Sequence, residues 1–488
     1  MKWSVETVHD PAMISGRHVV RSHEVTRSDT LRNPAWLKRS VGGRLVAVIG
    51  ALVAVILAMT ALSHAEELGP QTPKPAEDWS LHFQSTGIFQ AYPGFHSSFR
   101  SPSGLPSGGE GRETVSATAF LGRRLPWEGG EFYFNPEANQ GFGLNRTFGI
   151  AGFPNGEAQK AGFDTPKPNV ARLFLRQTFG LGGAAETVED GPNRLAGPVD
   201  VSRVTVTAGK FAVTDIFDDN QYAHDPRTTF MNWSLWEAAA WDYPADQKGY
   251  TDGAAVELNQ QGWALRGGWF LEPKRANDRD LEPRFWKRYG AVIELETRHE
   301  LVGELGKLRF LVFANRAPMG NLQQAVALAA ETGTPADIVA ARRDRWKAGF
   351  AVNLEQAVTD DVGVFSRFSW NDGRTETWAF TDVDTSFSLG TSVKGTSWSR
   401  PQDTIGLGGA VNALSQAHRE FFAAGGTGIL VGDGRLDYAP EGIVEAYYSY
   451  RVVEPVSVTF DYQFVANPAY NRDRGPVSIF AARLHLEF

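Results

Sequence analysis

The chain has 488 residues and no cysteine. This absence excludes disulfide bonds, thiol catalysis, cysteine-ligated zinc and a lipid-modified N-terminal cysteine. An exported domain without disulfides needs another source of stability, and closure of a large sheet would provide it. Long apolar runs are also scarce, because none follows Leu62. We therefore expect no transmembrane helix beyond that point, so any later membrane crossing must use strands.

Recognisable catalytic and metal-binding motifs are missing as well. The sequence has no Gly-x-Ser-x-Gly elbow and no phosphate-cradling glycine loop, and His224 and His485 lack metal-ligand spacing. Glu294 and Glu296 could serve glycoside hydrolysis, but they share one face of a strand, where a polar surface explains them without chemistry. We expect no enzyme, no cofactor and no metal. The formal net charge of −8 also makes nucleic acid an unfavourable partner.

The one long apolar run, 45–62, predicts an export signal. Lys38, Arg39 and Arg44 precede it, and Ser63-His64-Ala65 follows with small residues at the positions that a signal peptidase inspects. A membrane anchor is the alternative, since about 18 apolar residues can just span a bilayer. The cleavage site and the Pro-rich polar sequence after it favour a cleaved, extended signal peptide over residues 1–65. The mature domain would then cover 66–488.

The rest of the chain contains segments in which apolar and polar residues alternate. This period of two is typical of strands that have one apolar and one polar face, as in membrane barrels. Such segments recur along the chain at Trp79–Gln90, Ala171–Thr178, Arg203–Ala208, Ala254–Asn259, Trp263–Phe270, Ala291–Glu296 and Val456–Phe464. A soluble sheet with one wet face would show the same pattern, so no single segment is decisive.

The connections between these segments carry turn and loop signals. Asn259–Gly262 predicts a short hairpin turn, and Asn371–Gly373 predicts another turn. The polar insertion Tyr92–Glu113 predicts an external loop. Leu322–Arg345 is Ala-rich with helical spacing, and we interpret it as a short helical excursion within a connection rather than as a second domain.

The last segment, Ser478–Phe488, alternates up to a terminal aromatic residue. Phe480, Ala482, Leu484 and Leu486 share the face of Phe488. A final alternating strand that ends in Phe resembles the signal by which outer-membrane barrel proteins are recognised for assembly. Together with the export signal, it predicts an all-β transmembrane antiparallel barrel.

Three stretches resemble the carbohydrate-selective porin family, often called OprB-type. The first joins Gly209–Phe211, Asp215–Tyr222 and Asp225–Phe230; the second joins Trp241–Asp246 and Gly249–Tyr250; the third joins Tyr462–Phe464 and Asn467–Pro476. The start of the expected barrel, from Trp79 through 132–144, is also similar to this family.

This resemblance implies a barrel of about 16 antiparallel strands around an aqueous channel. It also implies passive diffusion of mono- or oligosaccharides through the outer membrane of a Gram-negative bacterium. The expected partners are the sugar, outer-membrane lipid and the outer-membrane assembly machinery, with Phe488 as the assembly signal. The sequence does not decide whether the chain forms a homo-oligomer.

A sugar-selective pore needs hydrogen-bonding groups of both signs on its walls, because sugars are neutral and densely hydroxylated. The alternation predicts that acidic and basic side chains of the strands both face the lumen. The polar run Asp215–Arg227 is expected to line or narrow the channel. The candidate pore-lining residues are Arg172, Arg176, Arg203, Asp218, Asn220, Asp225, Arg227, Glu257, Arg266, Glu294 and Glu296.

Two alternative functions stay open from the sequence. A porin for phosphate or for general solutes would share the barrel, although an anion pore should have a mainly basic lumen. A soluble, secreted carbohydrate-binding protein would share the export signal and the aromatic residues, but it would need neither lipid-facing stripes nor a terminal Phe strand.

Overall fold

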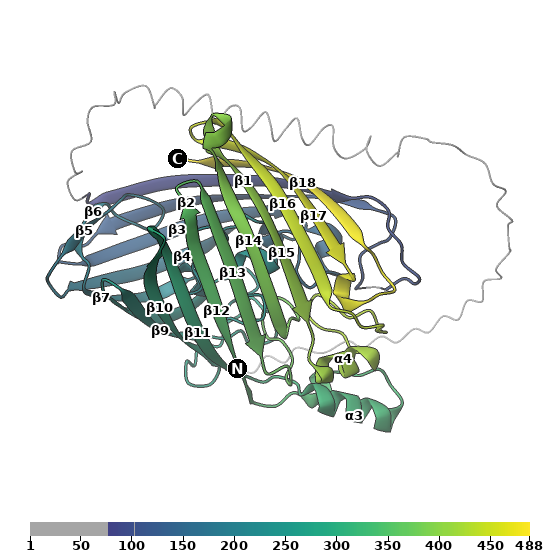
Figure 1. The fold of residues 1–488 in the computed structure, drawn as a ribbon. Coiled ribbons are helices and arrows are strands. Elements are labelled where there is room, and N and C mark those ends of the chain that lie inside the picture. Colours follow the sequence, from purple (N-terminus) through teal and green to yellow (C-terminus); the bar gives the residue numbers. More distant parts are fainter. Residues whose placement is uncertain (1–76, 102) are drawn as a thin grey trace, which may run out of the picture. The chain divides into compact units, whose positions relative to one another are not determined.

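Sixteen antiparallel strands close into one barrel. The computed structural model describes residues 77–101 and 103–488. Around the barrel the strands follow chain order, and the sheet closes where β1 pairs with β18. Phe83 and Phe488 complete this seam with two backbone hydrogen bonds of 3.2 and 2.9 Å. The prediction of an all-β barrel of about 16 strands is confirmed, since the barrel shown in Figure 1 has no open edge.

The barrel strands are β1 (Trp79–Tyr92), β2 (Glu110–Arg124), β3 (Gly130–Gly141), β4 (Phe163–Gly180), β7 (Arg203–Phe211), β8 (Thr251–Asn259), β9 (Trp263–Leu271), β10 (Tyr289–Leu301), β11 (Glu304–Ala317), β12 (Arg345–Thr359), β13 (Val362–Asn371), β14 (Thr385–Gly395), β15 (Arg400–Ala413), β16 (Glu441–Val453), β17 (Val456–Ala466) and β18 (Val477–Glu487). A separate hairpin consists of β5 (Ala185–Val188) and β6 (Gly197–Asp200). The helices are α2 (Trp233–Trp236), α3 (Leu322–Thr332) and α4 (Gln416–Ala423), with 3-10 turns η1 (Leu144–Thr147), η2 (Gly156–Gln159), η3 (Val213–Asp215), η4 (Val339–Ala341), η5 (Thr396–Trp398) and η6 (Pro468–Tyr470). Within the described ranges, no helix is long and apolar enough to cross a membrane.

Burial in the strands is the reverse of that in a soluble protein. On β17, Phe460 is 62% exposed, whereas its neighbours Thr459 and Asp461 are buried. On β1, Trp79 and Leu81 are exposed in the same way on the outer wall. Apolar side chains therefore cover the outside and polar ones fill the inside, which is the arrangement that a lipid environment requires.

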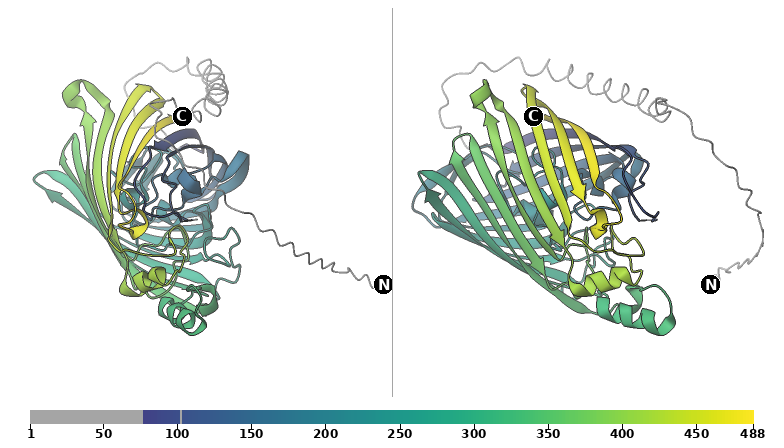
Figure 2. Two further views of the ribbon diagram at one scale, coloured as in Figure 1. Left: turned by 90° about the vertical axis from the view of Figure 1, so that its right-hand side faces the viewer. Right: turned by 45° about the vertical axis from the view of Figure 1, so that its right-hand side comes forward.

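The two ends of the barrel differ in the length of their connections. At one end, here the short-turn end, β8 and β9 are joined by residues 260–262 and β10 and β11 by residues 302–303; both termini of the barrel and the β5–β6 hairpin also lie there. At the other end, the long-loop end, the connections run to tens of residues, as in 212–250 and 414–440. Figures 1 and 2 show α3 and α4 side by side at the long-loop end, far from β5 and β6.

The alternating segments of the sequence lie in β1, β4, β7, β8, β9, β10 and β17, and the last segment lies in β18. Asn259–Gly262 forms the predicted hairpin turn between β8 and β9, and the helical excursion is α3 in the β11–β12 connection. Asn371–Gly373 opens a longer connection, 372–384. This connection is part of the cap, which consists of the connections that carry α3 and α4 together with 372–384 at the long-loop end. The leader 1–65 and its boundary with 66–488 fall outside the described residues and stay predictions.

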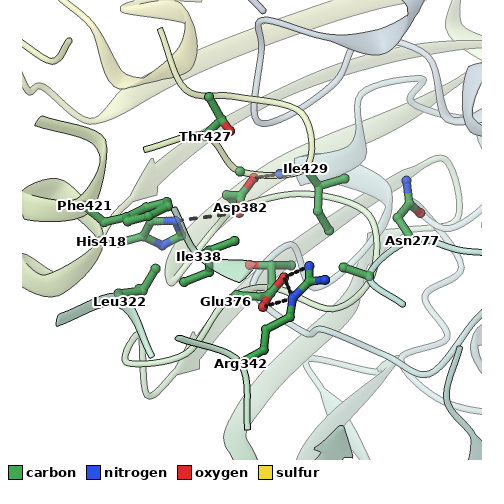
Figure 3. A pocket seen from close by; sticks show the side chains of 13 residues that line it. Asn277, Leu322, Ile338, Arg342, Glu376, Asp382, His418, Phe421, Thr427 and Ile429 are labelled. Carbon is green, nitrogen blue, oxygen red and sulfur yellow. Dashed lines mark hydrogen bonds and ion pairs between the residues drawn. The ribbon is translucent and has the colours of Figure 1, made fainter. Parts of the chain in front are cut away.

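The cap at the long-loop end encloses a cavity of about 330 Å³ (Figure 3). Arg342 and Glu376 form a bidentate ion pair across it, with contacts of 2.5 and 2.9 Å. Its apolar lining includes Leu322 of α3 and Phe421 of α4. The connections that carry these residues are thus held together by both apolar packing and charge.

His418 of α4 is buried between two carboxylates of the β13–β14 connection. Its Nδ1 lies 3.0 Å from Asp384 and its Nε2 lies 3.6 Å from Asp382, with Lys347 of β12 buried nearby. Burial disfavours the imidazolium, but the two carboxylates outweigh it and raise the pKa of His418. Burial likewise opposes ionisation of Asp384, yet His418 lowers the pKa of that carboxyl to about 2. Asp382, in contrast, has a raised pKa because burial dominates.

We predict that Phe460→Arg destabilises the barrel. A cation on the lipid face costs about 2–4 kcal/mol near the bilayer midplane. Urea unfolding in lipid vesicles measures this cost. As a control, Val302→Arg changes a residue that is 95% exposed in the turn at the short-turn end, and it should shift the unfolding free energy by no more than about 0.5 kcal/mol. An equal loss from both variants would contradict a lipid-facing position for Phe460.

We predict that the cap loosens as the pH rises. The pKa of His418 is higher in the folded than in the unfolded state, so its protonation stabilises the fold fully below about pH 6.5, and this contribution disappears as the pH passes the folded value. Asp384 contributes above about pH 4 and loses its contribution as the pH falls toward its folded pKa. Hydrogen-exchange protection of 372–384 and 414–424 should therefore decline as the pH rises above about 6.5 and through the folded pKa of His418.

His418→Gln should remove this pH dependence while retaining a hydrogen bond to Asp384. His299→Gln is a control, because His299 lies in β10 and contacts Gln356 at 2.9 Å, away from the cap. The explanation fails if the cap of the His418→Gln variant still loosens with rising pH as the wild type does.

Candidate functional site

The β7–β8 connection, 212–250, folds into the barrel and is bonded to its inner wall. Arg483 of β18 donates to two carbonyls of this loop at 2.8 and 2.7 Å, and Glu445 of β16 accepts two of its amides at 2.6 and 2.9 Å. Glu294 of β10 accepts another loop amide at 2.7 Å, and Arg367 of β13 donates to a loop carbonyl at 2.8 Å. Since these strands are spread around the barrel, the loop, here called the inner loop, crosses the lumen.

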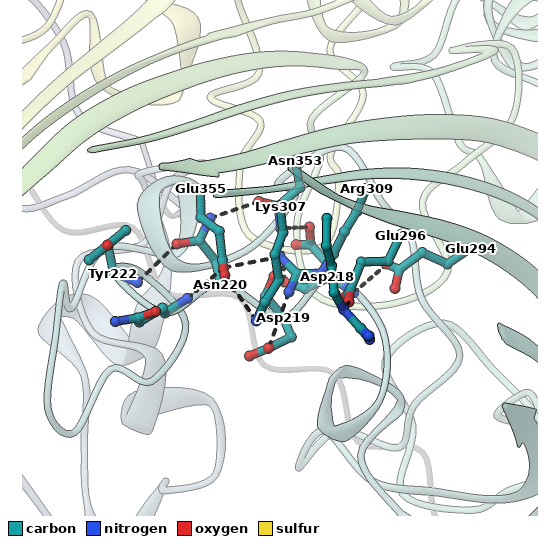
Figure 4. Close-up of polar contacts among 12 residues, drawn as sticks. Asp218, Asp219, Asn220, Tyr222, Glu294, Glu296, Lys307, Arg309, Asn353 and Glu355 are labelled. Atoms are coloured by element: carbon teal, nitrogen blue, oxygen red, sulfur yellow. Dashed lines mark hydrogen bonds and ion pairs between the residues drawn. The ribbon is translucent and has the colours of Figure 1, made fainter. Parts of the chain in front are cut away.

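Asp218 and Asn220 anchor the inner loop. The Asp218 carboxylate accepts hydrogen bonds from Asn353 at 2.6 Å and from Arg367 at 3.2 Å, and Asn220 donates to Asn353 at 2.7 Å (Figure 4). Both residues are buried, and neither lines the cavities described below. Glu237 lies beside them, where burial and then the charge of Asp218 raise its pKa well above the usual range. These two sequence candidates therefore fix the loop to the wall.

A ladder of ion pairs covers the wall from β8 to β12. Arg266 contacts Glu257 at 3.1 Å, Glu294 at 2.8 Å and Glu296 at 3.1 Å, so it joins three of the sequence candidates. Arg309 continues the ladder, bonding Glu296 at 2.9 Å and reaching toward the inner loop (Figure 4). The alternation predicts that these side chains point into the lumen, and in the structure they form ion pairs with one another.

The centre of the barrel is packed by aromatic side chains of the connections. Phe153 of the β3–β4 connection stacks on Trp233 of the inner loop with centroids 5.0 Å apart. The ring of Tyr243 packs on that of Phe380 in the β13–β14 connection, with centroids 4.5 Å apart. Connections from several strands thus form one apolar core within the lumen. Two cavities remain off-centre beside β4 and β7, and another of about 500 Å³ lies between Tyr222 of the inner loop and the turns 302–303 and 360–361.

A cavity of about 200 Å³, the upper cavity, lies between the β3–β4 connection, β4 and the inner loop. Arg172 binds Asp215 in a bidentate pair of 2.6 and 2.5 Å. Arg227 lies 3.1 Å from Glu157. The charged lining is completed by Lys160 and Asp225, so both signs are present on facing sides.

A second cavity of about 350 Å³, the lower cavity, lies on the short-turn side of the first. It is bordered by Arg176 of β4, Arg194 of the β5–β6 hairpin and Asp219 of the inner loop. Asp215 and His224 border both cavities, so the two are neighbours. Both lie beside the inner face of β4 and β7, and this row of two cavities is here called the path.

The charges along this path are fixed in their ionised forms. Burial opposes ionisation of Asp215, but Arg172 outweighs it and lowers the pKa of that carboxyl. The pKa of Asp225 is lowered in the same way by Arg227, against burial. Burial also disfavours the Arg227 cation, yet Glu157 and Asp225 keep the pKa of its guanidinium well above the usual range.

Aromatic rings and unused donors complete the upper cavity. Tyr250, Tyr243 and Trp236 border it, and Lys160 lies 5.0 Å above the Tyr250 ring. The donors Arg172 Nη1 and Trp236 Nε1 are buried, and in the part of the chain that the structure describes they have no hydrogen-bond partner. Such donors can bind a polar ligand without first breaking a protein contact. No group of acidic and histidine side chains among residues 77–101 and 103–488 is arranged to hold a metal ion.

Four sequence candidates border the path: Arg172, Arg176, Asp225 and Arg227. Arg203 instead lies at the start of β7, where it contacts Glu186 of the β5–β6 hairpin at 2.7 Å. Sequence reasoning did not select the lining residues Glu157, Lys160, Trp236, Tyr243 and Tyr250, and it included Asp215 and His224 only as members of the run Asp215–Arg227. All of these lie in connections, where no period shows which side chain faces open space.

Comparison with known proteins adds an independent line of evidence about the family. The sequence matches the family described as carbohydrate-selective porin, OprB family, over residues 109–488. The high-pH structure of Pseudomonas putida OprB has a TM-score of 0.65 at 16% identity, covering 84% of this chain and 94% of that chain. The outer-membrane channel DcaP of Acinetobacter baumannii has a TM-score of 0.46 at 9% identity, covering 86% of this chain and 100% of that chain. No curated protein matches the sequence.

The family match spans most of the barrel, and the similarity to the Pseudomonas putida protein shows the same fold. The resemblance inferred from the three sequence stretches is thereby confirmed, as is the outer-membrane location. A closed barrel with an apolar outside and a charged inside is a channel architecture. The chain belongs to the OprB family of carbohydrate-selective porins and forms a carbohydrate-selective channel of the outer membrane.

Proposed function

We propose that sugars cross this channel along the β4–β7 wall, through the upper cavity and then the lower one. The observation that carries the proposal is the lining of the upper cavity, where ion pairs of both signs, aromatic rings and unused donors meet. Since outer-membrane barrels have long extracellular loops and short periplasmic turns, the upper cavity would receive sugar from outside.

The chemistry of this lining suits a neutral polyol. Arg172, Arg227 and Lys160 offer donors, and the carboxylates of Glu157, Asp215 and Asp225 offer acceptors. Because the signs are balanced, the field in the path is small and a mobile ion gains little there, whereas hydroxyl groups can bind both kinds of partner. The guanidinium groups keep their charge at any physiological pH, so this preference would not depend on pH.

The aromatic rings would contact the apolar face of a sugar ring, as flat apolar surfaces in mixed sites do. The small volume of the upper cavity favours mono- or disaccharides over longer oligosaccharides. Passage would be passive diffusion, with no chemical step. A general-solute porin is the alternative, and the measurement below separates the two.

We predict that Arg227→Ala weakens sugar binding in the pore by about tenfold, the loss expected for one charged hydrogen-bonding partner. It should also shift the pore toward cation selectivity, because Glu157 and Glu137, which Arg227 contacts at 3.1 and 3.2 Å, lose a counter-charge. Planar-bilayer conductance, titrated with glucose and with maltose and repeated in a salt gradient, measures both effects.

Arg472→Ala is the matched control, since Arg472 is an exposed arginine of the β17–β18 connection that contacts Asp437 at 3.5 Å. Its sugar block and reversal potential should equal those of the wild type. Conductance that no sugar reduces, in wild type and variant alike, would favour a general-solute pore. Sugar block that survives Arg227→Ala unchanged would place the path elsewhere in the lumen.

We also propose that Phe488 is recognised by the outer-membrane assembly machinery. Its backbone pairs with Phe83 at the seam, so the same residue that ends the chain also closes the barrel. Phe488→Ala should reduce the amount of barrel in the outer membrane severalfold, while refolding of the purified chain into detergent, followed by heat-modifiable gel mobility, stays unchanged. Equal losses in cells and in refolding would assign Phe488 a structural role only.

A further inference from the structure

The last part of the β9–β10 connection, 284–288, lies against the outer wall of the barrel at the long-loop end, whereas Ala276 and Asn277 of the same connection line the cap cavity. Trp269, an outward-facing residue of β9, donates its Nε1 proton to the Phe285 carbonyl at 3.0 Å. Phe285 and Trp286 are nevertheless 57% and 61% exposed. A loop that is fixed to the lipid-facing wall and displays two large aromatic side chains places them at the level of the membrane interface.

An arginine lies within the aromatic row next to this loop. Tyr289, Arg316 and Trp346 occupy paired positions on β10, β11 and β12, so their side chains share the outer face. Trp269 stacks on Tyr289 with ring centroids 3.8 Å apart, and Tyr289 packs edge-to-face against Trp346 with ring centroids 5.5 Å apart. A cation between aromatic rings that belong at the membrane interface is suited to an anionic lipid headgroup.

Further cations surround this row. They are Arg284, Lys287 and Arg288 of the β9–β10 connection and Arg343 of the β11–β12 connection, whereas Arg345 lies on the inner face and binds Gln324 of α3 at 2.6 Å. They outnumber the nearby carboxylates, of which Glu282 is held by Arg284 at 2.7 and 2.9 Å and Asp344 lies 3.9 Å from Arg316. The whole chain carries a net charge of −8, so this concentration of positive charge is local.

Several of these cations retain unused donors. Lys287 forms no ion pair and no side-chain hydrogen bond with any other residue in the described ranges. Arg316 is partly exposed, and its carboxylate partner in the same ranges, Asp344, lies 3.9 Å away. An ammonium and a guanidinium group with free donors can bind an oxyanion at the membrane surface.

We propose that this basic-aromatic patch, formed by Arg284–Arg288, Arg316 and Trp346, binds the phosphorylated headgroup of an outer-leaflet lipid. The phosphate contacts Lys287 and Arg316, and the acyl chains lie against Phe285 and Trp286. Charge complementarity and position select this occupant, since the patch lies at the outer rim of the lipid-facing wall. The site is separate from the lumen and does not depend on the sugar path.

Native mass spectrometry of the purified protein in detergent tests the proposal. The probe is lipid A with both phosphates, titrated beside zwitterionic phosphatidylcholine and, in a separate arm, inorganic phosphate. We expect discrete lipid A adducts whose affinity falls as the salt concentration rises. In the variant Lys287→Gln/Arg316→Gln, lipid A should bind at least about tenfold more weakly, which corresponds to the loss of one to two charged contacts.

The control is Arg435→Gln/Arg472→Gln, which removes two exposed arginines from other connections at the same end of the barrel. It should bind lipid A as the wild type does. The proposal is overturned if Lys287→Gln/Arg316→Gln binds lipid A as tightly as the wild type, or if the control loses as much. It is also overturned if phosphatidylcholine binds equally well, or if inorganic phosphate at the same concentration displaces the lipid.

Discussion

The rest of the structure depends on one constraint: in a bilayer, the backbone of the outer wall has no water to hydrogen-bond with. Only a sheet without edges satisfies every amide and carbonyl, so the first and last strands must pair, and here Phe83 and Phe488 complete the seam. Closure then fixes which face each strand turns outward. Because the outside must be apolar, mid-strand charges such as those of Glu294 and Arg309 are directed into the lumen, and the large polar interior follows from the barrel rather than from the sugar.

Charges directed into a confined lumen must be satisfied, and the inner loop satisfies many of them. Glu445 and Glu294 accept loop amides, while Arg483 and Arg367 donate to loop carbonyls. An unpaired charge at these positions would be costly, whereas each bonded one fixes a segment of loop backbone. The same side chains that closure places inside therefore hold the inner loop across the channel. Its aromatic residues pack the centre, so the cavities of the proposed sugar path lie off-centre, beside β4 and β7.

The sequence predicts the barrel well because alternation is a local property with a direct physical cause. Each recognised segment lies in a strand, and the apolar face is the outer one. The site is predicted less well, because alternation separates inside from outside but does not indicate which inward residues a loop will cover. Asp218 and Asn220 have the composition of pore-lining residues, yet Asn353 and Arg367 bury them in loop anchorage. Lys160 and Tyr250 come together only through folding of two distant connections, and neither connection has a period.

Balanced charge explains how a rigid pore can still favour neutral solutes. Arg172 with Asp215, and Arg227 with Glu157, are pairs in which each group already has a strong partner. A mobile ion of either sign would have to compete with that partner and would meet an opposing charge nearby, so it gains little on entering. A hydroxyl group can instead donate to the carboxylate and accept from the guanidinium without separating them. On the proposed path, the pairs that fix its geometry are therefore also the groups best placed to distinguish a sugar from a salt ion.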